Sequence, residues 1–389
     1  MKVTITDISK DGKGIGRTEE GRVVFVPGTV PGDVAELEPF SIIKPSPDRV
    51  DPPCPYFSEC GGCPLMCLSP EAQLRIKRQH VKDALERIGG FEEGKDYVLM
   101  DVLYTGEQFR YRNKAEFAIQ GGRIGYLKRG SHELLEIDDC PIQSPQTAAA
   151  AAEFKARLKP TQKYFKRLII RTSSDGEVMT ITENSDGTTT SDRRILHDEI
   201  VTEAGTLKTE VSPLSFYQVN PKACSLLYSK AQEYAALTGA EKLLDLYCGA
   251  GSIGLSMAGR CSKVIGVESV KPAVIDANRN AVINGIVNAT FICGKAEEVI
   301  DTKLQGVKAD VVIVDPPRAG CKKSLLEAIR RIAPKRLVYV SCDPATLARD
   351  LKILCTEGDG CRFRLIEATP VEMFPMTLHV ETVCLLTYS

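Results

Sequence analysis

The stretch KLLDLYCGAGSIG, at residues 242–254, decides the fold of the C-terminal half of this chain. Its first part, KLLDLYC, predicts a buried strand, and Gly249, Gly251 and Gly254 follow before residues that predict a helix. Glycines at this spacing let the backbone approach a ligand at the carboxyl end of a strand. The stretch therefore predicts the first strand–turn–helix unit of a nucleotide-binding α/β sheet.

The residues after this stretch alternate between strand and helix patterns. The apolar runs VIGVE, ATFICG, ADVVIVDPP and RLVYVSC predict strands, a helix is predicted over 271–285, and the residues from 363 onward predict two more strands. Such alternation is typical of a parallel sheet covered by helices on both faces. We therefore expect an α/β fold with a Rossmann-like domain over residues 216–389.

Carboxylates lie at or near the ends of the predicted strands. Asp245 is on the first strand, Glu268 ends the next strand 23 residues later, and Asp315 precedes Pro316 and Pro317. A carboxylate in the position of Glu268 can accept hydrogen bonds from both ribose hydroxyls of a nucleotide. The glycine-rich turn is also compatible with NAD, whereas DLYCGAG and the Asp-Pro-Pro motif favour S-adenosylmethionine and the methylation of a nucleobase.

Two further residues match one reaction. Cys342 is predicted at a strand end, before a helix whose N-terminus should lower the pKa of the thiol. Glu381 lies in the apolar strand HVETVCLLTY, where a carboxylate needs a partner or a function, whereas we interpret His379 as structural. A thiolate that adds to carbon 6 of uracil makes carbon 5 nucleophilic toward a methyl sulfonium, and a base then removes the proton from carbon 5. Donors near Asp315 and Arg318 would stabilise the negative charge, and the target nucleotide would have to flip out of its helix.

The first half of the chain has a different pattern. Residues 1–48 contain short strand patterns separated by Gly-Pro turns, and the proline-rich residues 41–55 predict a linker. A helix is predicted over 71–88 and another over 221–238, while residues 100–210 predict a mixed, strand-rich domain. The sequence therefore predicts a small β domain and a mixed central domain before the α/β domain.

Positive charge is concentrated between residues 110 and 129, although the net charge of the chain is −1. Six basic residues and one acidic residue lie there, interleaved with Tyr111, Phe117 and Tyr126. Such a segment is compatible with an RNA-binding surface, and it is equally compatible with the solvated face of a strand.

The chain has fourteen cysteines, no signal-peptide pattern and no apolar run long enough to span a membrane, so we expect a cytoplasmic protein. Four cysteines have the spacing of a thiolate metal site, which suits either Zn²⁺ or an iron–sulfur cluster: Cys54, Cys60, Cys63 and Cys140. Cys67 is a fifth cysteine that could compete as a ligand. Because no long apolar surface pattern occurs, we expect a monomer.

On these motifs, nearly the whole chain resembles the RNA uracil-5 methyltransferase family, and in particular its bacterial 23S ribosomal RNA enzymes. SCDPATLARDL resembles the nucleophile motif and HVETV the general-base segment, which implies Cys342 as nucleophile and Glu381 as base. SFYQVN resembles the segment before the methyltransferase domain. The resemblance implies that S-adenosylmethionine is bound by Gln218, Tyr247, Glu268 and Asp315. Ser252 stands where relatives often have Asn.

The resemblance also implies a structural [4Fe-4S] cluster on Cys54, Cys60, Cys63 and Cys140, and a TRAM-like RNA-binding β-barrel at the N-terminus. The sequence between DVAELE and KPSPDRV indicates that this barrel is shorter than usual by a strand. The expected domains are a TRAM-like domain at 1–48, an iron–sulfur region at 49–100 and 130–145, a central RNA-binding domain at 70–215 and a methyltransferase domain at 216–389.

The expected function is methylation of carbon 5 of a uridine in 23S ribosomal RNA through a covalent adduct with Cys342. The same reaction on tRNA is the alternative, and the four cysteines favour ribosomal RNA because well-known bacterial tRNA relatives lack them. An iron–sulfur oxidoreductase that uses NAD or a flavin would leave Asp315, Cys342 and Glu381 without a role. A non-catalytic RNA-binding protein would need neither Cys342 nor Glu381.

Overall fold

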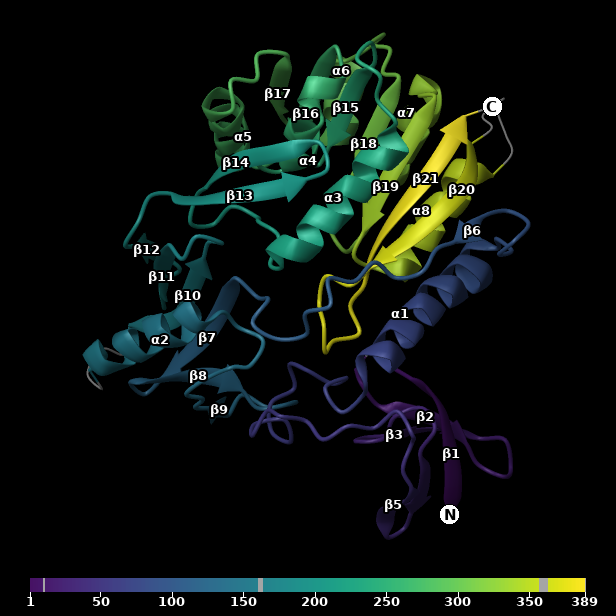
Figure 1. Ribbon diagram of the computed structural model, residues 1–389, viewed down its shortest axis with the longest axis vertical. Coiled ribbons are helices and arrows are strands. Elements are labelled where there is room, and N and C mark those ends of the chain that lie inside the picture. The colour runs from purple at the N-terminus through teal and green to yellow at the C-terminus, as the bar shows by residue number, and fades with distance from the viewer. Residues whose placement is uncertain (10, 160–163, 357–362, 389) are drawn as a thin grey trace.

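The computed structural model describes residues 1–389 except 10, 160–163, 357–362 and 389. The described chain folds into three parts: N-terminal strands, a central sheet and a large C-terminal sheet covered by helices (Figure 1). Among the described residues, no helix is both long enough and apolar enough to cross a lipid bilayer.

The N-terminal part is an antiparallel sheet in the order β3-β2-β1-β4-β5. Its strands are β1 (Lys2–Ile8), β2 (Gly14–Arg17), β3 (Val23–Val26), β4 (Val34–Leu37) and β5 (Phe40–Lys44). Alternate residues of β1 are buried, among them Val3 and Ile5, so one face of this sheet packs inward. Strand β5 occupies the stretch where the sequence indicated a shortened barrel.

The central part is a six-stranded sheet in the order β12-β11-β10-β7-β8-β9. Its strands are β7 (Lys114–Gln120), β8 (Arg123–Leu127), β9 (Leu134–Leu135), β10 (Phe165–Thr172), β11 (Val178–Asn184) and β12 (Thr189–Ser191). Helix α2 (Pro145–Arg157) begins at Ser144, whose hydroxyl accepts the amide of Thr147, and it packs on β10 and β11. Ala151 from this helix joins Leu168 and Ile170 in a small apolar core.

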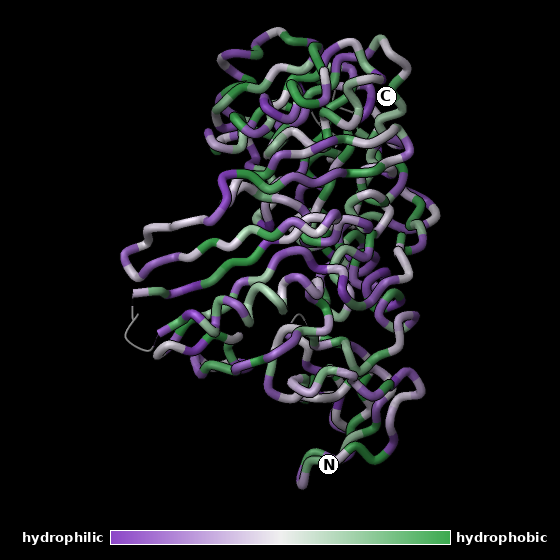
Figure 2. The backbone as a smooth tube through the Cα atoms, turned by 60° about the vertical axis from the view of Figure 1, so that its left-hand side comes forward, coloured by the Kyte–Doolittle hydropathy of each residue, from purple (hydrophilic) through white to green (hydrophobic). Residues whose placement is uncertain are grey.

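The large sheet has eight strands in the order β17-β16-β15-β18-β19-β21-β20-β6. Its strands are β15 (Lys242–Leu246), β16 (Lys263–Glu268), β17 (Ala289–Cys293), β18 (Val311–Val314), β19 (Arg336–Ser341), β20 (Phe363–Val371), β21 (Glu381–Tyr388) and β6 (Val98–Leu99). Strands β15 to β19 are parallel, and β21 is antiparallel to both β19 and β20. Figure 2 shows hydrophobic stretches running through this part of the molecule and hydrophilic stretches around it.

Two apolar cores cover the two faces of the large sheet. The helices are α1 (Pro70–Ala84), α3 (Pro221–Ala235), α4 (Ser252–Ser256), α5 (Lys271–Ile283), α6 (Ala296–Thr302), α7 (Lys323–Ile332) and α8 (Pro344–Cys355). Residues of α1, α6, α7 and α8 form one core, whereas residues of α3, α4 and α5 and of the hairpin β13 (Leu196–Thr202) and β14 (Gly205–Val211) form the other. The predicted α/β sheet with helices on both faces is confirmed.

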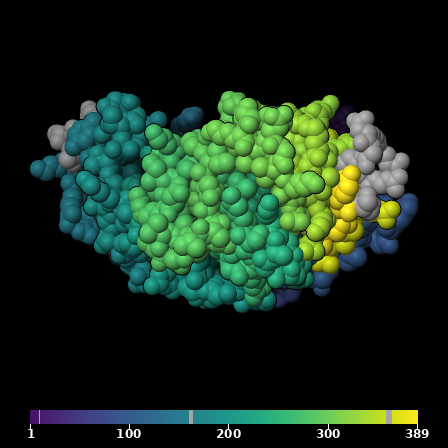
Figure 3. All heavy atoms as spheres, turned by 90° about the horizontal axis from the view of Figure 1, so that it is seen from above, coloured from purple at the N-terminus to yellow at the C-terminus, as the bar shows by residue number. Residues whose placement is uncertain are grey.

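The first hundred residues contribute directly to the large sheet. Helix α1 continues into a π-helical turn, Leu85–Gly89, as the prediction of a helix over 71–88 required. Val81 packs into the same core as α7 and α8, and β6 pairs with β20 at the sheet edge. In the view of Figure 3, residues coloured blue lie beside the yellow C-terminal strands. The structure therefore places α1 and β6 with the α/β sheet rather than with the central domain expected over 70–215.

Candidate active site

The predicted nucleophile and base meet because of the pairing of β19 with β21. Ser341 pairs with Thr382 in this antiparallel register, so the next residues outward, Cys342 and Glu381, lie side by side at the strand ends. Asp315 directly follows β18, the parallel neighbour of β19. Three side chains from distant parts of the sequence thus share one edge of the sheet, where open α/β folds bind ligands.

Burial and like charge control the two carboxyls at this edge. Glu381 is only 5% exposed, and burial together with the negative charge of Asp315 raises its pKa to about 8. Burial raises the pKa of Asp315 to about 7. The guanidinium of Arg318 acts in the opposite direction on Glu381. The pair can therefore accept or release a proton near neutral pH.

The expectation of an acidified thiol at Cys342 is wrong. Burial, with the nearby Glu381 and Asp315 carboxyls, raises the pKa of Cys342 to about 11, and Arg318 opposes this shift only in part. The amides at the start of α8 do not compensate, because the side chain of Asp343 caps them. Its Oδ1 accepts the amides of Ala345 and Thr346 at 2.9 and 3.0 Å.

The turn after β15 has the backbone of a ligand cradle. Tyr247 adopts a φ of +63°, a left-handed conformation that is strained in residues other than glycine. A Cβ on Gly254 would lie 2.8 Å from Oδ2 of Asp245, so this position requires glycine. That Oδ2 accepts the amide of Gly254 at 3.0 Å, whereas the buried Oδ1 has no partner among the described residues. Burial raises the pKa of Asp245 to about 7.

Glu268 ends β16 with its carboxylate held by the backbone. Its Oε2 accepts the amide of Gly249 at 3.1 Å, and its Oε1 accepts the amide of Val270 at 2.8 Å. The glycine-rich turn and the second strand end are thereby joined. The hydroxyl of Ser269 also donates to Oε1 at 3.1 Å, so the remaining acceptor capacity of this carboxylate lies on Oε2.

Gln218 and Ser252 occupy the loop before α3 and the first turn of α4. Gln218 is buried, and its backbone carbonyl accepts a hydrogen bond from the side-chain amide of Asn113 at 3.0 Å. The hydroxyl of Ser252 lies 2.6 Å from that of Tyr228, a buried residue of α3. Tyr228 shares the buried face of α3 with Cys224 and Leu227, so its sequence pattern is that of an ordinary core residue.

A buried ion pair holds the segment that leads to Glu381. Lys77 of α1 is fully buried and contacts both carboxylate oxygens of Glu372, the second at 2.6 Å. Its ammonium also donates to the carbonyl of Phe374 at 3.0 Å. Burial lowers the pKa of Lys77 and raises that of Glu372, and each charge partly offsets the effect on the other. Nothing local in the sequence indicates this pair, because its members lie 295 residues apart.

Other contacts hold the same segment. The side chain of Gln73 accepts the amide of Met376 at 2.9 Å, and the carbonyl of Met376 accepts the amide of Leu65 at 3.0 Å. The hydroxyl of Tyr111 donates to the carbonyl of Pro375 at 3.0 Å. Helix α1, the cysteine region and the central domain therefore converge on the residues before Glu381.

The four predicted metal-binding cysteines lie around one small cavity of about 30 Å³. The cavity is lined by Cys54, Cys60, Cys63 and Cys140 together with apolar residues such as Met66 and Tyr126. Burial raises the pKa of Cys63 to about 12, and the neighbouring Cys140 contributes. Cys67 instead packs into the core between the N-terminal sheet and α1. Within the described ranges, no group of three or more His, Cys, Asp or Glu side chains is arranged to hold a single metal ion.

A cleft of about 730 Å³ connects the cysteine region to the active-site edge. Its lining includes five basic residues: Arg112, Lys114, Lys128, Arg129 and Arg318. Lys128 is paired with Glu59 and Glu133, so its charge is partly neutralised. Arg110 lies outside this cleft and pairs with Asp139 at 2.5 Å.

The aromatic residues of the basic segment do not form an exposed surface. Phe117 and Tyr126 stack with ring centroids 4.9 Å apart in the core of the central sheet. Tyr111 is 5% exposed. The aromatic residues of the segment 110–129 are therefore core residues, whereas four of its basic residues line the cleft.

Comparisons with known proteins show the family of this chain. The sequence pattern of the tRNA (Uracil-5-)-methyltransferase family matches residues 177–389, and that of the TRAM domain matches residues 1–38. An uncharacterized RNA methyltransferase of Halalkalibacterium halodurans is 36% identical over 99% of this chain and 96% of its own. One from Caldanaerobacter subterraneus subsp. tengcongensis is 38% identical over 99% and 97%. The tRNA (uracil-54, C5)-methyltransferase of Pyrococcus abyssi, solved with S-adenosyl-L-homocysteine, is 27% identical, covers 100% of both chains and superposes with a TM-score of 0.76.

Proposed function

Because this chain belongs to the RNA uracil-5 methyltransferase family, whose members transfer a methyl group from S-adenosylmethionine to carbon 5 of uracil in RNA, we propose that Cys342 is its covalent nucleophile and Glu381 its general base. The observation that carries this proposal is the Ser341–Thr382 register, which brings the thiol and the carboxyl together at the sheet edge. Because the chain belongs to this family, it is neither the iron–sulfur oxidoreductase nor the non-catalytic RNA-binding protein of the alternative hypotheses.

The reaction needs a thiolate, although the Cys342 thiol is protonated at neutral pH in the free protein. The positive sulfonium of bound S-adenosylmethionine would lower the pKa of both Asp315 and Glu381, so that one of them can accept the thiol proton. Sγ then adds to carbon 6 of uracil, and the electrons of the C5–C6 double bond move to the carbonyl at carbon 4. The guanidinium of Arg318 lies in this charged cluster and can stabilise the enolate.

S-adenosylmethionine supplies the methyl group, which carbon 5 takes up. Glu381 then removes the proton from carbon 5, the double bond re-forms, and the Cys342 thiolate leaves and regains a proton. The net products are the methylated uridine, S-adenosylhomocysteine and one proton. Two carboxyls are useful here, because one holds the thiol proton while the other accepts the proton from carbon 5.

We assign S-adenosylmethionine binding to Gln218, Tyr247, Glu268 and Asp315. Glu268 is fixed by two backbone amides and the Ser269 hydroxyl, and its Oε2 keeps a lone pair for a ribose hydroxyl. Tyr247 and the glycines after it form a turn that lets the ligand approach the backbone. The unpartnered buried Oδ1 of Asp245 supports a polar ligand above this turn.

For the cysteine site we propose a [4Fe-4S] cluster, with zinc as the alternative. Four thiols around one buried cavity provide the ligand number of such a cluster, and binding iron would favour the thiolate forms that burial disfavours. The role would be structural, because the methyl transfer involves no electron transfer. Cys54, Cys60, Cys63 and Cys140 would be the ligands.

The cluster can be tested by elemental analysis of anaerobically purified protein. Wild-type protein should contain iron and acid-labile sulfide and show broad visible absorption. Cys140→Ser should lose both, whereas Cys67→Ser should retain them because Cys67 lies in a different core. Detection of stoichiometric zinc without sulfide would instead indicate a site that binds a single zinc ion.

For the substrate we propose 23S ribosomal RNA. This proposal is supported by the four cysteines of the proposed cluster site, whose pattern resembles that of the ribosomal enzymes. A specific observation favours tRNA as second candidate: the Pyrococcus abyssi enzyme, which covers the whole chain, methylates tRNA at uracil 54.

The deciding experiment supplies methyl-labelled S-adenosylmethionine together with unmodified 23S ribosomal RNA or unmodified tRNA, followed by digestion to nucleosides. Label in 5-methyluridine from ribosomal RNA is the expected result. Label only from tRNA would keep the mechanism and change the substrate. Label in neither RNA would contradict the proposed substrate classes.

A further inference from the structure

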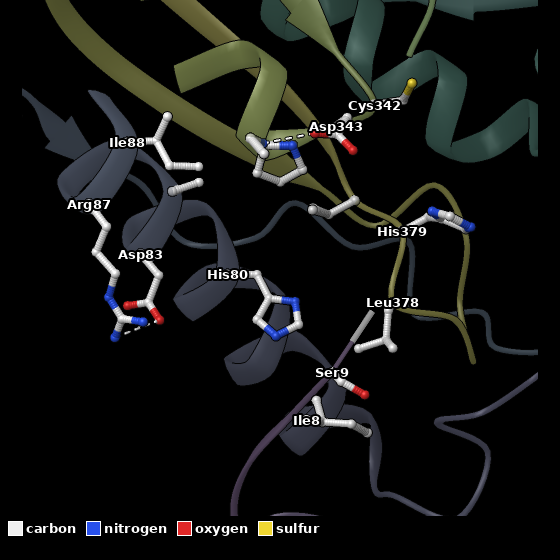
Figure 4. A pocket seen from close by; sticks show the side chains of 14 residues that line it. Ile8, Ser9, His80, Asp83, Arg87, Ile88, Cys342, Asp343, Leu378 and His379 are labelled. Atoms are coloured by element: carbon white, nitrogen blue, oxygen red, sulfur yellow. Dashed lines mark hydrogen bonds and ion pairs between the residues drawn. The ribbon is translucent and has the colours of Figure 1, made fainter. Parts of the chain in front are cut away.

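A second cavity, of about 400 Å³, is lined in part by Cys342 and Asp343. Its walls come from four separate segments: Ile8 at the end of β1, His80 of α1, Pro344 at the start of α8, and Leu378 before β21. In Figure 4 the sulfur of Cys342 points away from these side chains. The cavity is therefore separate from the space in which the thiol would attack its uridine.

The walls of this cavity suit a flat heteroaromatic ring. Ile8, Leu378 and Val380 give it apolar surfaces, and the imidazole of His80 adds a flat polar group, whereas the ring of His379 points away from His80 (Figure 4). Burial lowers the pKa of the His80 imidazole, which is therefore neutral at pH 7, and its Nε2 lies 3.9 Å from Oδ1 of Asp7. Apolar walls with a few directional polar groups are what a pocket for a nucleobase needs.

The position of the cavity limits which ligand can reach it during catalysis. Cys342 and Asp343 form part of its wall, so any RNA group inside it lies within a short length of backbone from a uridine bonded to the thiol. His379 lines both this cavity and the basic cleft, so the two spaces meet at one residue. A strand whose phosphates follow the cleft can therefore place one base at the thiol and a neighbouring base behind it.

We propose that this cavity binds the unstacked base of a nucleotide next to the target uridine, so that the enzyme reads a flanking base as well as the target. The proposal rests on the proposed role of Cys342 as nucleophile. It assigns His80 and Ile88, which lie about two turns apart on the α1 helix and its π-helical extension, to recognition of RNA rather than to chemistry.

The first test compares His80→Ala and Ile88→Asn with the control Ile366→Asn. Ile88 and Ile366 are 42% and 39% exposed, so both substitutions remove a similar surface group, but Ile366 lies on β20 outside the cavity. Filter binding to 23S ribosomal RNA and tRNA transcripts gives Kd, and label transfer gives KM and kcat. Loss of one stacked base weakens binding about tenfold. We expect this loss in Kd and KM for both cavity variants, with kcat and S-adenosylmethionine affinity unchanged and with the control like wild type.

Each other outcome has a definite meaning. If both cavity variants bind RNA as tightly as the control, the cavity holds no base and the proposal fails. If kcat falls while RNA binding is unchanged, the cavity supports Cys342 and the proposal also fails. If neither transcript is methylated by wild type, the proposed substrate fails, while the binding measurements still decide the cavity.

A second test identifies the base itself. Single abasic residues are introduced on either side of the target uridine of the methylated transcript, and binding to wild type and to His80→Ala is compared. An abasic residue at one flanking position should weaken wild-type binding about tenfold but should have little further effect on His80→Ala. Equal losses in both proteins at every position would overturn the proposal.

Discussion

The thiol of Cys342 and the carboxyl of Glu381 are each held in the protonation state opposite to the one that the proposed reaction uses. Both pKa values are raised by burial and by the negative charges around them. A free thiolate in the absence of substrate would be open to oxidation, so a protonated resting state protects the nucleophile. Activation then depends on the positive charge of the co-substrate, which couples reactivity to binding.

Cys342→Ala should abolish methyl transfer and any covalent RNA adduct, because it removes the thiol proposed to attack carbon 6 of the target. Binding of S-adenosylmethionine should remain, since Cys342 is not among its proposed contacts. Cys355→Ala, at the other end of α8, is the matched control and should stay active. Label incorporation and denaturing gels with RNA measure both effects, and turnover by Cys342→Ala would remove this residue from the mechanism.

Glu381→Gln should trap the adduct between protein and RNA. The amide cannot accept the proton from carbon 5, so the methylated intermediate cannot release the Cys342 thiolate. A species that survives denaturation and contains labelled methyl should accumulate while turnover falls. If the variant releases methylated RNA at the wild-type rate, another group acts as the base.

The pH dependence of methyl transfer follows from the raised pKa of Glu381. Protonated Glu381 cannot act as the proposed base, and its pKa is about 8 in the free protein. The value of kcat/KM for RNA should therefore rise as pH increases from about 6 to about 9. Arg318 lowers the pKa of Glu381, so Arg318→Gln should move the rise to higher pH. A profile that is flat over this range would contradict the assigned groups.

The site could be predicted from sequence where its residues stand in short motifs at strand ends. Cys342, Glu381, Glu268 and Asp315 each follow or begin an apolar strand, and parallel packing then brings them to one edge. The pKa of Cys342 could not be predicted, because the cap at Asp343 and the opposing carboxyls depend on tertiary packing.

At the scale of elements, α1 acts as a clamp on the segment before β21. Lys77 and Glu372 form its centre, and both are buried. Burying this pair costs desolvation that only the intact pair offsets, so the structure tolerates loss of both charges better than loss of one.

Lys77→Met should lower the free energy of unfolding by about 3–5 kcal/mol, because it leaves the Glu372 carboxyl buried without its partner. The double substitution Lys77→Met with Glu372→Leu should be less destabilising than the sum of the single changes. Arg75→Met is the matched control on the same helix, where an exposed pair with Asp48 contributes about 0–1 kcal/mol. Urea unfolding midpoints measure all four variants, and additive effects would contradict the coupling.

The elements themselves were well predicted wherever periodicity is local. The helix predicted over 221–238 is observed as Pro221–Ala235, with Asn220 capping the amide of Ala223. The assignment of β6 was not predictable, because its two residues become a strand only by pairing with Glu367 and Ala368 on a strand more than 260 positions later. The burial of Tyr111 could likewise not be predicted from the sequence, since its hydrogen-bond partner Pro375 lies 264 residues away.

At the scale of the whole molecule, the basic cleft should determine how RNA affinity depends on salt. Arg129 is exposed in this cleft, so Arg129→Gln should weaken binding of all RNA sequences similarly and reduce the slope of log Kd against log salt by about 1. Arg364→Gln, on β20 outside the cleft, should leave the slope unchanged. An unchanged slope for Arg129→Gln would exclude a phosphate contact there.

Strand β6 is the outermost strand of the eight-stranded sheet, and the pairing continues beyond it, since the amides of Met100 and Leu103 donate to the carbonyls of Ala368 and Pro370 at 2.9 Å. A protein fragment of residues 216–389 alone would have no strand paired with the outer edge of β20, and α8 would lose its contact with α1. Bare edges recruit strands from other chains, so such a fragment is expected to aggregate during expression. A minimal catalytic module must therefore retain residues 70–103, either fused to the fragment or supplied as a separate complementing peptide.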